Sequence, residues 1–306
     1  MIARISIGGR DYSTDLSKGR SIAIPLRFSG TQPNSYDVPP AIAVPFEAGA
    51  FIGDTRRGGS CNFDTVTLTP HCNGTHTECV GHISNERISV EDILKPSLLP
   101  ATLISVQIEH AMQSEEHYEP AKAEGDLLIT ASALRNGFEK VDPSFSTETA
   151  AGAAADFEHP GTGTGHPVSG IDAGFYEAII IRTLPNDSSK LSRRYMEEPA
   201  AFFSIEAMRF LRGLGVRHLL VDIPSLDRAF DEGRMVAHHI FWDAAMGSHE
   251  ILPGDASPCT VTEMIFVEDD IPDGRYLIDI QIAPFVADAA PSRPVIFPLT
   301  PNSVGT

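Results

Sequence analysis

The chain has 306 residues, enough to bury a large core, and its hydrophobic (42%) and charged (21%) fractions are ordinary for a globular protein. Its formal net charge of −18 argues against nucleic acid and anionic membrane surfaces as partners, because phosphate groups would be repelled. No stretch approaches the roughly 18 apolar residues of a membrane span, and four cysteines are too few for a disulfide scaffold, so we expect a reduced, cytoplasmic protein.

The first half of the chain is predicted to consist mainly of strands and extended segments. Alternating apolar and polar residues predict a strand within residues 1–10 and short strands or extended segments at 21–26 and 41–46. Residues 61–70 alternate well enough to predict a half-buried strand, which leads directly into a cluster of histidines.

Further along, we expect a helical turn at 90–94, strands at 101–108 and 126–130, and a helix that begins near Ser132. The fully apolar run at 178–183 is typical of a central strand of a sheet.

A helix between two strands is predicted in the second half. Residues 204–212 have helical amphipathicity, with Ser204 as the N-cap and Gly213 at the C-terminal end. Residues 218–222 form a buried strand, and residues 278–283 alternate as a late strand. The strand at 178–183, the helix at 204–212 and the strand at 218–222 predict a βαβ unit, so the expected fold class is α/β.

No internal repeat and no clear linker divides the chain, so we expect a single domain over residues 1–306 with a strand-rich N-terminal part. The glycine- and threonine-rich string at 161–165 is not a phosphate loop, because no strand directly precedes it and no Lys-Ser/Thr pair follows.

Residues 71–82 contain many side chains of the types that bind metal ions. Two glycines among them let the backbone turn tightly and direct several side chains inward. A single histidine is more often an ordinary hydrogen-bonded residue, but three imidazoles and a carboxylate at these spacings predict a divalent-metal site. The cluster comprises His71, Cys72, His76, Glu78, Cys79 and His82.

Two later segments offer further ligands. His238 and His239 are adjacent and point in different directions, so at most one of them can reach a given ion. Trp242 follows and could form the wall of a pocket, although a core role is the more common one. Glu263 interrupts an apolar run, and therefore either faces solvent or is neutralised by a cation or a partner.

Asp222 and Asp227 follow a buried strand, where α/β enzymes gather functional groups, and a loop-capping role is equally compatible with the pattern. Ser225 lacks the Gly-x-Ser-x-Gly context of a nucleophile elbow, which argues against a serine hydrolase.

In combination, these segments resemble the cyclase-like metal-dependent hydrolase family that includes bacterial kynurenine formamidase. The family signature His-x-Gly-Thr-His-x-Asp-x-Pro-x-His is similar to residues 71–82, where Gly74-Thr75-His76 matches and His82 has the expected spacing. The family's Gly-x-Asp-x-Pro-Ser-x-Asp, His-His-x-Leu-Leu, Glu-Asn-Leu and Pro-Pro-Gly-Arg-Tyr segments are similar, in that order, to residues 221–227, 238–241, 263–265 and 272–276.

The chain departs from the signature at three positions. Glu78 stands where the family has Asp, and Gly81 lies near the position of the family's Pro. The first signature His falls on Cys72, with His71 one residue earlier, and either could be the ligand. We favour His71, because a loop can absorb the extra residue.

The resemblance implies a swivelling β/β/α fold, a homo-oligomer of at least two subunits, and a hydrolase that acts on linear amides or on cyclic amides and esters of a small-molecule substrate. One or two divalent ions, Zn²⁺ or Mn²⁺, would activate water and polarise the scissile carbonyl. The expected ligands are His71, His76, Glu78, His238 and Glu263.

His82 is the candidate catalytic proton shuttle, because an unperturbed imidazole titrates near about 6.5 and can act in both directions. Thr75 would help to orient a ligand or water. Two alternatives stay open: a ring-opening hydrolase or cyclase with another substrate, and a metal-dependent binding protein that has lost turnover.

Overall fold

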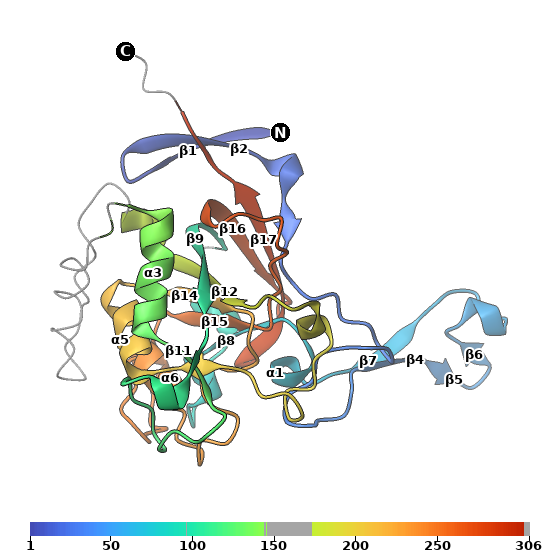
Figure 1. Cartoon of the computed structure of the whole chain (residues 1–306). Helices are drawn as coiled ribbons and strands as arrows, with labels where there is room; N and C mark the ends of the chain where they lie inside the picture. The colour runs from blue at the N-terminus through green and yellow to red at the C-terminus, as the bar shows by residue number, and fades with distance from the viewer. Residues whose placement is uncertain (96, 144, 146–172, 303–306) are drawn as a thin grey trace.

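A closed ring of seven strands forms the centre of the molecule in this computed structural model, which describes residues 1–95, 97–143, 145 and 173–302 (Figure 1). Each strand is hydrogen-bonded to the next, and the pairing of the last with the first closes the ring. In order around the ring the strands are β16 (Gly274–Ile282), β9 (Leu98–Gln107), β12 (Ala178–Leu184), β14 (His218–Val221), β15 (Thr260–Glu263), β8 (His76–Cys79) and β17 (Ala289–Pro298).

Four of these strands, β9, β12, β14 and β15, run parallel, and β12 lies between β9 and β14 as its apolar run predicts. The helix α5 (Ile205–Gly213) connects β12 to β14, so the βαβ unit and the α/β class are confirmed. Ser204 caps this helix, because its side chain accepts a hydrogen bond from the amide of Ala207. The swivelling description of the fold stays a prediction.

The two faces of the ring carry two separate apolar clusters. Alternate residues such as Ile179, Leu219 and Val261 pack outward against the helices α3 (Ala131–Val141), α5 and α6 (Val236–Phe241). Their neighbours Ile180 and Leu220 pack inside the ring. This alternation is the two-residue period of a strand buried on both faces.

Polar side chains interrupt the inner face where β14, β15 and β8 meet. His218 Nδ1 lies 2.9 Å from Thr260 Oγ1, and the hydroxyls of Thr77 and Thr262 are 2.8 Å apart. Because successive side chains point to opposite faces, the neighbours of Thr77 and Thr262, which are His76, Glu78 and Glu263, lie on the outer face that α6 covers.

Short elements surround the ring. They are β1 (Ile2–Ile7), β2 (Arg10–Asp15) and β18 (Thr300–Pro301) in one sheet, β10 (Glu109–His110), β11 (Leu127–Ile129) and β13 (Phe202–Phe203) in another, β3 (Arg20–Ser21) beside β17, and the helices α1 (Pro70–Asn73) and α2 (Val90–Ile93). Within the residues described, no helix has the length and apolar character needed to cross a membrane.

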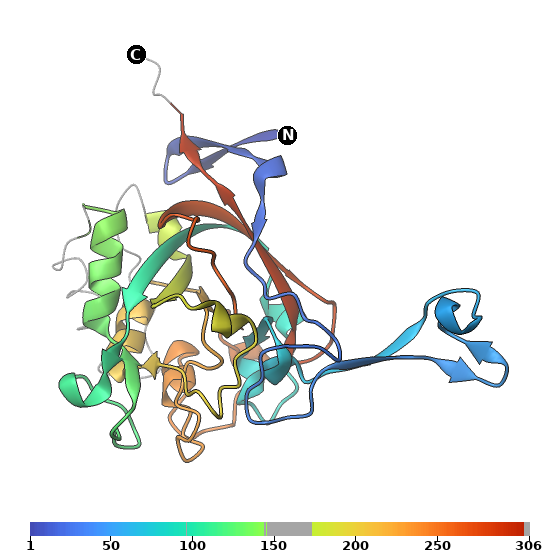
Figure 2. The same cartoon turned by 45° about the vertical axis from the view of Figure 1, so that its right-hand side comes forward.

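One two-stranded ribbon leaves the body altogether. β4 (Ile42–Pro45) pairs with β7 (Asp64–Thr67), and the tip carries β5 (Glu47–Ala48) and β6 (Phe51–Ile52). Figures 1 and 2 show this ribbon projecting from the ring with no other element beside it.

The prediction of a half-buried strand at 61–70 is therefore wrong in its burial, since all four residues of β7 are exposed. Alternation of residue types in this segment reflects a ribbon that has solvent on both faces. The predicted strands and helical segments at 1–10, 41–46, 90–94, 101–108, 126–130, 178–183, 204–212, 218–222 and 278–283 are present in the structure. The string at 161–165 lies outside the described residues.

Candidate metal centre

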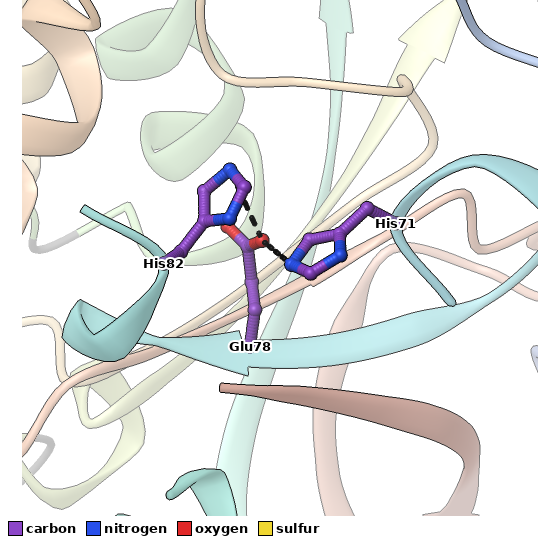
Figure 3. A group of neighbouring side chains, drawn as sticks. All are labelled: His71, Glu78 and His82. Atoms are coloured by element: carbon purple, nitrogen blue, oxygen red, sulfur yellow. Dashed lines mark ion pairs between the residues drawn. The ribbon is translucent and has the colours of Figure 1, made fainter. Parts of the chain in front are cut away.

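Glu78 is the carboxylate around which the histidine cluster converges. It lies on β8 with an exposed side-chain fraction of only 1%, and Figure 3 shows the rings of His71 and His82 next to its carboxylate. Glu78 Oε2 is 3.4 Å from His71 Nε2 and 4.0 Å from His82 Nε2. The rings of His71 and His82 are stacked, with centroids 4.3 Å apart.

A second group shares the same carboxylate. His76 Nε2 lies 3.9 Å from Glu78 Oε2 and 3.4 Å from Glu263 Oε2. His238 Nε2 lies 3.1 Å from Glu78 Oε1 and 3.7 Å from Glu263 Oε1. The structure thus brings all six predicted site residues together, although β8 and α6 are separated by more than half of the sequence.

Strand register explains how three of these side chains meet. β8 and β15 are antiparallel, with Glu263 opposite His76 and Val261 opposite Glu78, so all three functional side chains share one face. Glu263 is 3% exposed and lies beside two imidazoles, so of the two alternatives that the sequence left open, a solvent-facing side chain is excluded.

His82 reaches the cluster through a tight turn after β8. A Cβ atom added to Gly81 would lie 2.1 Å from the carbonyl oxygen of Ile88, so only glycine fits this close approach of two backbones. The same turn brings His82 back over Glu78, four residues earlier.

Asp227 fixes the orientation of His238. Its Oδ2 lies 2.6 Å from His238 Nδ1, and its two oxygens also accept hydrogen bonds from the amides of Ala237 and His238 at the start of α6. The imidazole therefore presents Nε2 to Glu78 and Glu263. Both predicted roles of Asp227, in the site and in loop capping, are found in one side chain.

Asp288 is a further acidic residue of the cluster that was not predicted from the sequence. This residue lies directly before β17, and its Oδ2 is 3.1 Å from His71 Nε2 and 3.5 Å from His82 Nδ1. No signature marks it, and the pairing of β17 with β8, which brings it to the site, is a contact between distant parts of the chain.

Other candidate residues have structural contacts. The Thr75 hydroxyl donates to the carbonyl of Met264 and accepts from the amide of Ile24, so backbone groups occupy it. Asp222 pairs with the buried Lys190 at 2.8 Å. Burial, together with the charges of Glu263 and Glu78, raises the pKa of Cys72 to about 11, which disfavours the thiolate.

Trp242 lies beside the cluster, with its ring centroid 5.0 Å from that of His238 and 6.5 Å from that of His82. It is buried, so it is both part of the core and a wall of the site. His239, the second of the two adjacent imidazoles, faces His249 instead, with ring centroids 6.4 Å apart.

The electrostatics of the cluster favour a cation. Burial opposes ionisation of Glu78, but His82, His238 and His71 together hold its pKa below the usual range. Burial likewise opposes protonation of His238, yet Asp227, Glu263 and Glu78 raise its pKa well above the ordinary value. Hydrogen bonding to His71 and His82 lowers the pKa of Asp288. Four carboxylates thus gather where positive charge must balance them.

The donor set fits a divalent metal ion. His76 Nε2 and Glu78 Oε2 are buried, and neither has a hydrogen-bond partner among the described residues. Buried polar atoms without a hydrogen bond cost free energy unless something else binds them. Two groups have ligand atoms all within 4.8 Å of one another, namely His71, Glu78 and His82, and His76, Glu78 and Glu263.

Comparisons with solved structures show which known folds this chain resembles. Among solved structures, the chain is similar to one described as a novel cyclase (TM-score 0.54, 12% identity, 92% of this chain and 89% of that chain). It is similar to an isatin hydrolase bound to the product analogue thioisatinate (TM-score 0.53, 12% identity, 93% of each chain). It is also similar to a predicted metal-dependent hydrolase from Bacillus stearothermophilus (TM-score 0.50, 14% identity, 92% and 98%).

At these identities the likeness concerns the fold. A comparison with curated proteins gave no match. The family model described as "Putative cyclase" matches residues 15–228, which is more than half of the chain. The protein is therefore a member of the cyclase family.

Proposed function

We propose that this protein is a metal-dependent hydrolase that cleaves an amide bond, or the ring of a cyclic amide or ester, in a small-molecule substrate. The single observation that carries the proposal is that two buried atoms, His76 Nε2 and Glu78 Oε2, have no hydrogen-bond partner among the described residues although they lie inside a cluster of imidazoles and carboxylates. A purely structural cluster would satisfy these atoms with hydrogen bonds.

His71, His76, Glu78, His238 and Glu263 would hold the metal. When bound, a divalent ion supplies an electrophile for the scissile carbonyl and lowers the pKa of water. Glu78 belongs to both ligand groups, which supports two ions that share its carboxylate. Zn²⁺ and Mn²⁺ both bind imidazole and carboxylate donors, and which of the two this protein binds stays a prediction.

His82 is the proposed proton shuttle. Its side chain is 29% exposed, so it can exchange protons with solvent, whereas His76 and His238 are buried. Asp288, 3.5 Å from His82 Nδ1, would orient the ring and stabilise its protonated form. His82 also belongs to one of the two ligand groups, so a role as a ligand is the competing assignment.

Elemental analysis of the purified protein tests the metal site. We expect a bound divalent metal in the wild type and its loss in His76→Ala. His110→Ala, which removes an exposed imidazole outside the cluster, is the control and should leave the metal content unchanged. Equal metal content in all three proteins would contradict the proposed site.

Turnover is a separate measurement. The likeness to an isatin hydrolase supports testing isatin as a cyclic amide, and N-formylkynurenine tests the linear amide suggested by the sequence. We expect the metal-loaded protein to hydrolyse at least one member of a panel of such amides and lactones. A protein that binds the metal and hydrolyses none of them would be a metal-dependent binding protein.

A further inference from the structure

A cavity of about 480 Å³, which we call the aromatic cavity, lies beside the candidate metal centre but is separate from it. None of the six predicted site residues lines it. Asp227 lies between the two, because it lines the cavity and also binds His238 Nδ1. The volume is within the roughly 300–1,000 Å³ that is typical of sites for small molecules. The walls come from four segments that are distant in the sequence, within 35–36, 123–127, 195–202 and 224–230.

Four aromatic residues line this cavity, namely Tyr36, Tyr195, Phe202 and Phe230. Tyr195 and Phe202 are each only 2% exposed, so they belong to its inner wall. Phe230 is 74% exposed and Tyr36 50%, so these two residues lie at the opening. Large apolar side chains exposed at the entrance of a cavity are typical of a surface that binds a ligand. The faces of aromatic rings carry partial negative charge and therefore attract cations.

The positive charge at the cavity is already balanced. Arg228 is the only basic residue among the described residues that line it. Its guanidinium pairs with Asp126 at 2.9 Å and donates to the carbonyl oxygens of Phe230 and Ala121 at 3.0 and 3.1 Å. An anionic ligand would therefore find no uncompensated cation in this wall.

Negative charge, in contrast, is not balanced. Glu124 lines the cavity, is exposed, and forms no ion pair within the described part of the chain. Asp231 is 8% exposed and accepts hydrogen bonds from two backbone amides, but no basic side chain among the described residues pairs with it. Burial and the charge of Asp231 raise the pKa of Tyr36 to about 12, so negative charge lies close to this aromatic wall.

We propose that the aromatic cavity binds a small organic cation of the alkylated ammonium class. Such an ion presents both its charge and its methyl groups to the faces of aromatic rings, which suits a wall that is apolar and electron-rich. The unbalanced carboxylates and the formal net charge of −18 favour a positive ligand over a neutral one. Ca²⁺ and Mg²⁺ are less suitable, because they need a shell of oxygen ligands that aromatic walls do not provide.

Calorimetric titration of the full chain with two matched probes tests the proposal. Choline carries a trimethylammonium group, and 3,3-dimethylbutan-1-ol has the same shape with carbon in place of the charged nitrogen. We expect choline to bind, and the neutral alcohol to bind at least roughly 10-fold more weakly, because only the charge distinguishes them. Equal affinities for the two probes, or no binding of choline up to about 10 mM, would overturn the proposal.

Variants then locate the binding site. Phe230→Leu keeps an apolar side chain but removes a ring, and should weaken choline binding about 2- to 5-fold. Phe285→Leu is the matched control, since Phe285 is 48% exposed and lies outside the cavity, and its affinity for choline should equal that of the wild type. Both rings are largely exposed, so we expect both variants to fold, as circular dichroism and thermal unfolding would show.

A second pair of variants tests the charge. Glu124→Gln should weaken the binding of choline and leave that of the neutral alcohol unchanged. Glu250→Gln, which neutralises an exposed carboxylate outside the cavity, is its control and should not change either affinity. If Phe230→Leu and Glu124→Gln both bind choline as the wild type does, the cation binds elsewhere on this acidic protein and the proposal is wrong.

Discussion

At the scale of single residues, the carboxylates behind the histidines matter as much as the proposed ligands. Asp227 is hydrogen-bonded to Nδ1 of His238, and Asp288 contacts the rings of His71 and His82. A carboxylate that binds the second nitrogen of a metal-binding histidine fixes the orientation of the ring. Loss of such a carboxylate therefore weakens metal binding without removing a ligand.

We therefore predict that Asp227→Asn weakens metal binding by about 10–100-fold, measured by competition with a chromophoric chelator. Asp231→Asn is the control, because this carboxylate lies in the same loop and accepts hydrogen bonds from Gly233 and Met235 instead. Equal affinities in the two variants would argue that Asp227 acts only as a helix cap.

A second prediction separates the two roles of His82. If it shuttles protons, His82→Gln keeps the metal content of the wild type and loses at least roughly 100-fold in kcat, the size of a typical contribution from general acid–base catalysis. His71→Gln, which removes a proposed ligand 3.4 Å from Glu78 Oε2, should instead lose metal. Loss of metal in His82→Gln would make His82 a ligand.

The sequence was sufficient for the six clustered residues, which lie in the signature or in the later family segments, and insufficient for Asp288. His76, Glu78 and His82 could be identified because they fall within seven residues and match a known spacing. Asp288 could not be identified, since it is an isolated acid in an apolar segment, and only the pairing of β17 with β8 brings it to the site.

At the scale of elements, the ends of β12 and β14 are joined by a buried ion pair. Lys190 Nζ lies 2.8 Å from Asp222 Oδ2 and also donates to the carbonyl and hydroxyl of Thr183. Removing one partner leaves the other charge buried without compensation.

Lys190→Met is therefore expected to lower the free energy of unfolding by about 3–5 kcal/mol in urea titrations. Lys95→Met gives the comparison, because Lys95 and Asp92 form a pair 3.7 Å apart with both side chains more than two thirds exposed. That change should cost less than about 1 kcal/mol. Similar losses in both variants would contradict the prediction.

His218, inside the ring at the start of β14, makes this strand sensitive to acid. Burial and the charge of Arg217 lower its pKa to about 4. In the unfolded chain the imidazole binds a proton near its ordinary pKa of about 6.5, so between these values only the unfolded state is protonated. His218 therefore does not lower the free energy of unfolding above about pH 6.5, and that free energy decreases as the pH falls from about 6.5 to about 4.

We predict that the unfolding free energy of the wild type falls by about 3 kcal/mol more than that of His218→Gln between pH 7 and pH 4. The control His110→Gln changes an exposed imidazole and should follow the wild type. Parallel curves for the wild type and His218→Gln would show that the native state accepts the proton.

At the scale of the whole molecule, local patterns predicted the βαβ unit but not the closure of the ring. The apolar runs of β12 and β14 and the amphipathic pattern of helix α5 can each be recognised within a few consecutive residues. Closure depends on β17, which pairs with β8 on one side and β16 on the other, and no local signal specifies such distant partners. The projecting ribbon of β4 and β7 was not predicted for a related reason, because alternation alone does not tell which face of a strand is covered.

The order in which the ribosome makes the chain gives β17 a particular importance. Strand β8, which carries His76 and Glu78, is made early and can pair with β15 once residue 263 has emerged, but its other edge waits for residues 289–291. Until then the nascent protein has an open barrel, and Asp288, which directly precedes β17, is not yet held at the site. Chains that end before β17 should therefore aggregate through the unpaired edge of β8, so the barrel can fold completely only after β17 has been made.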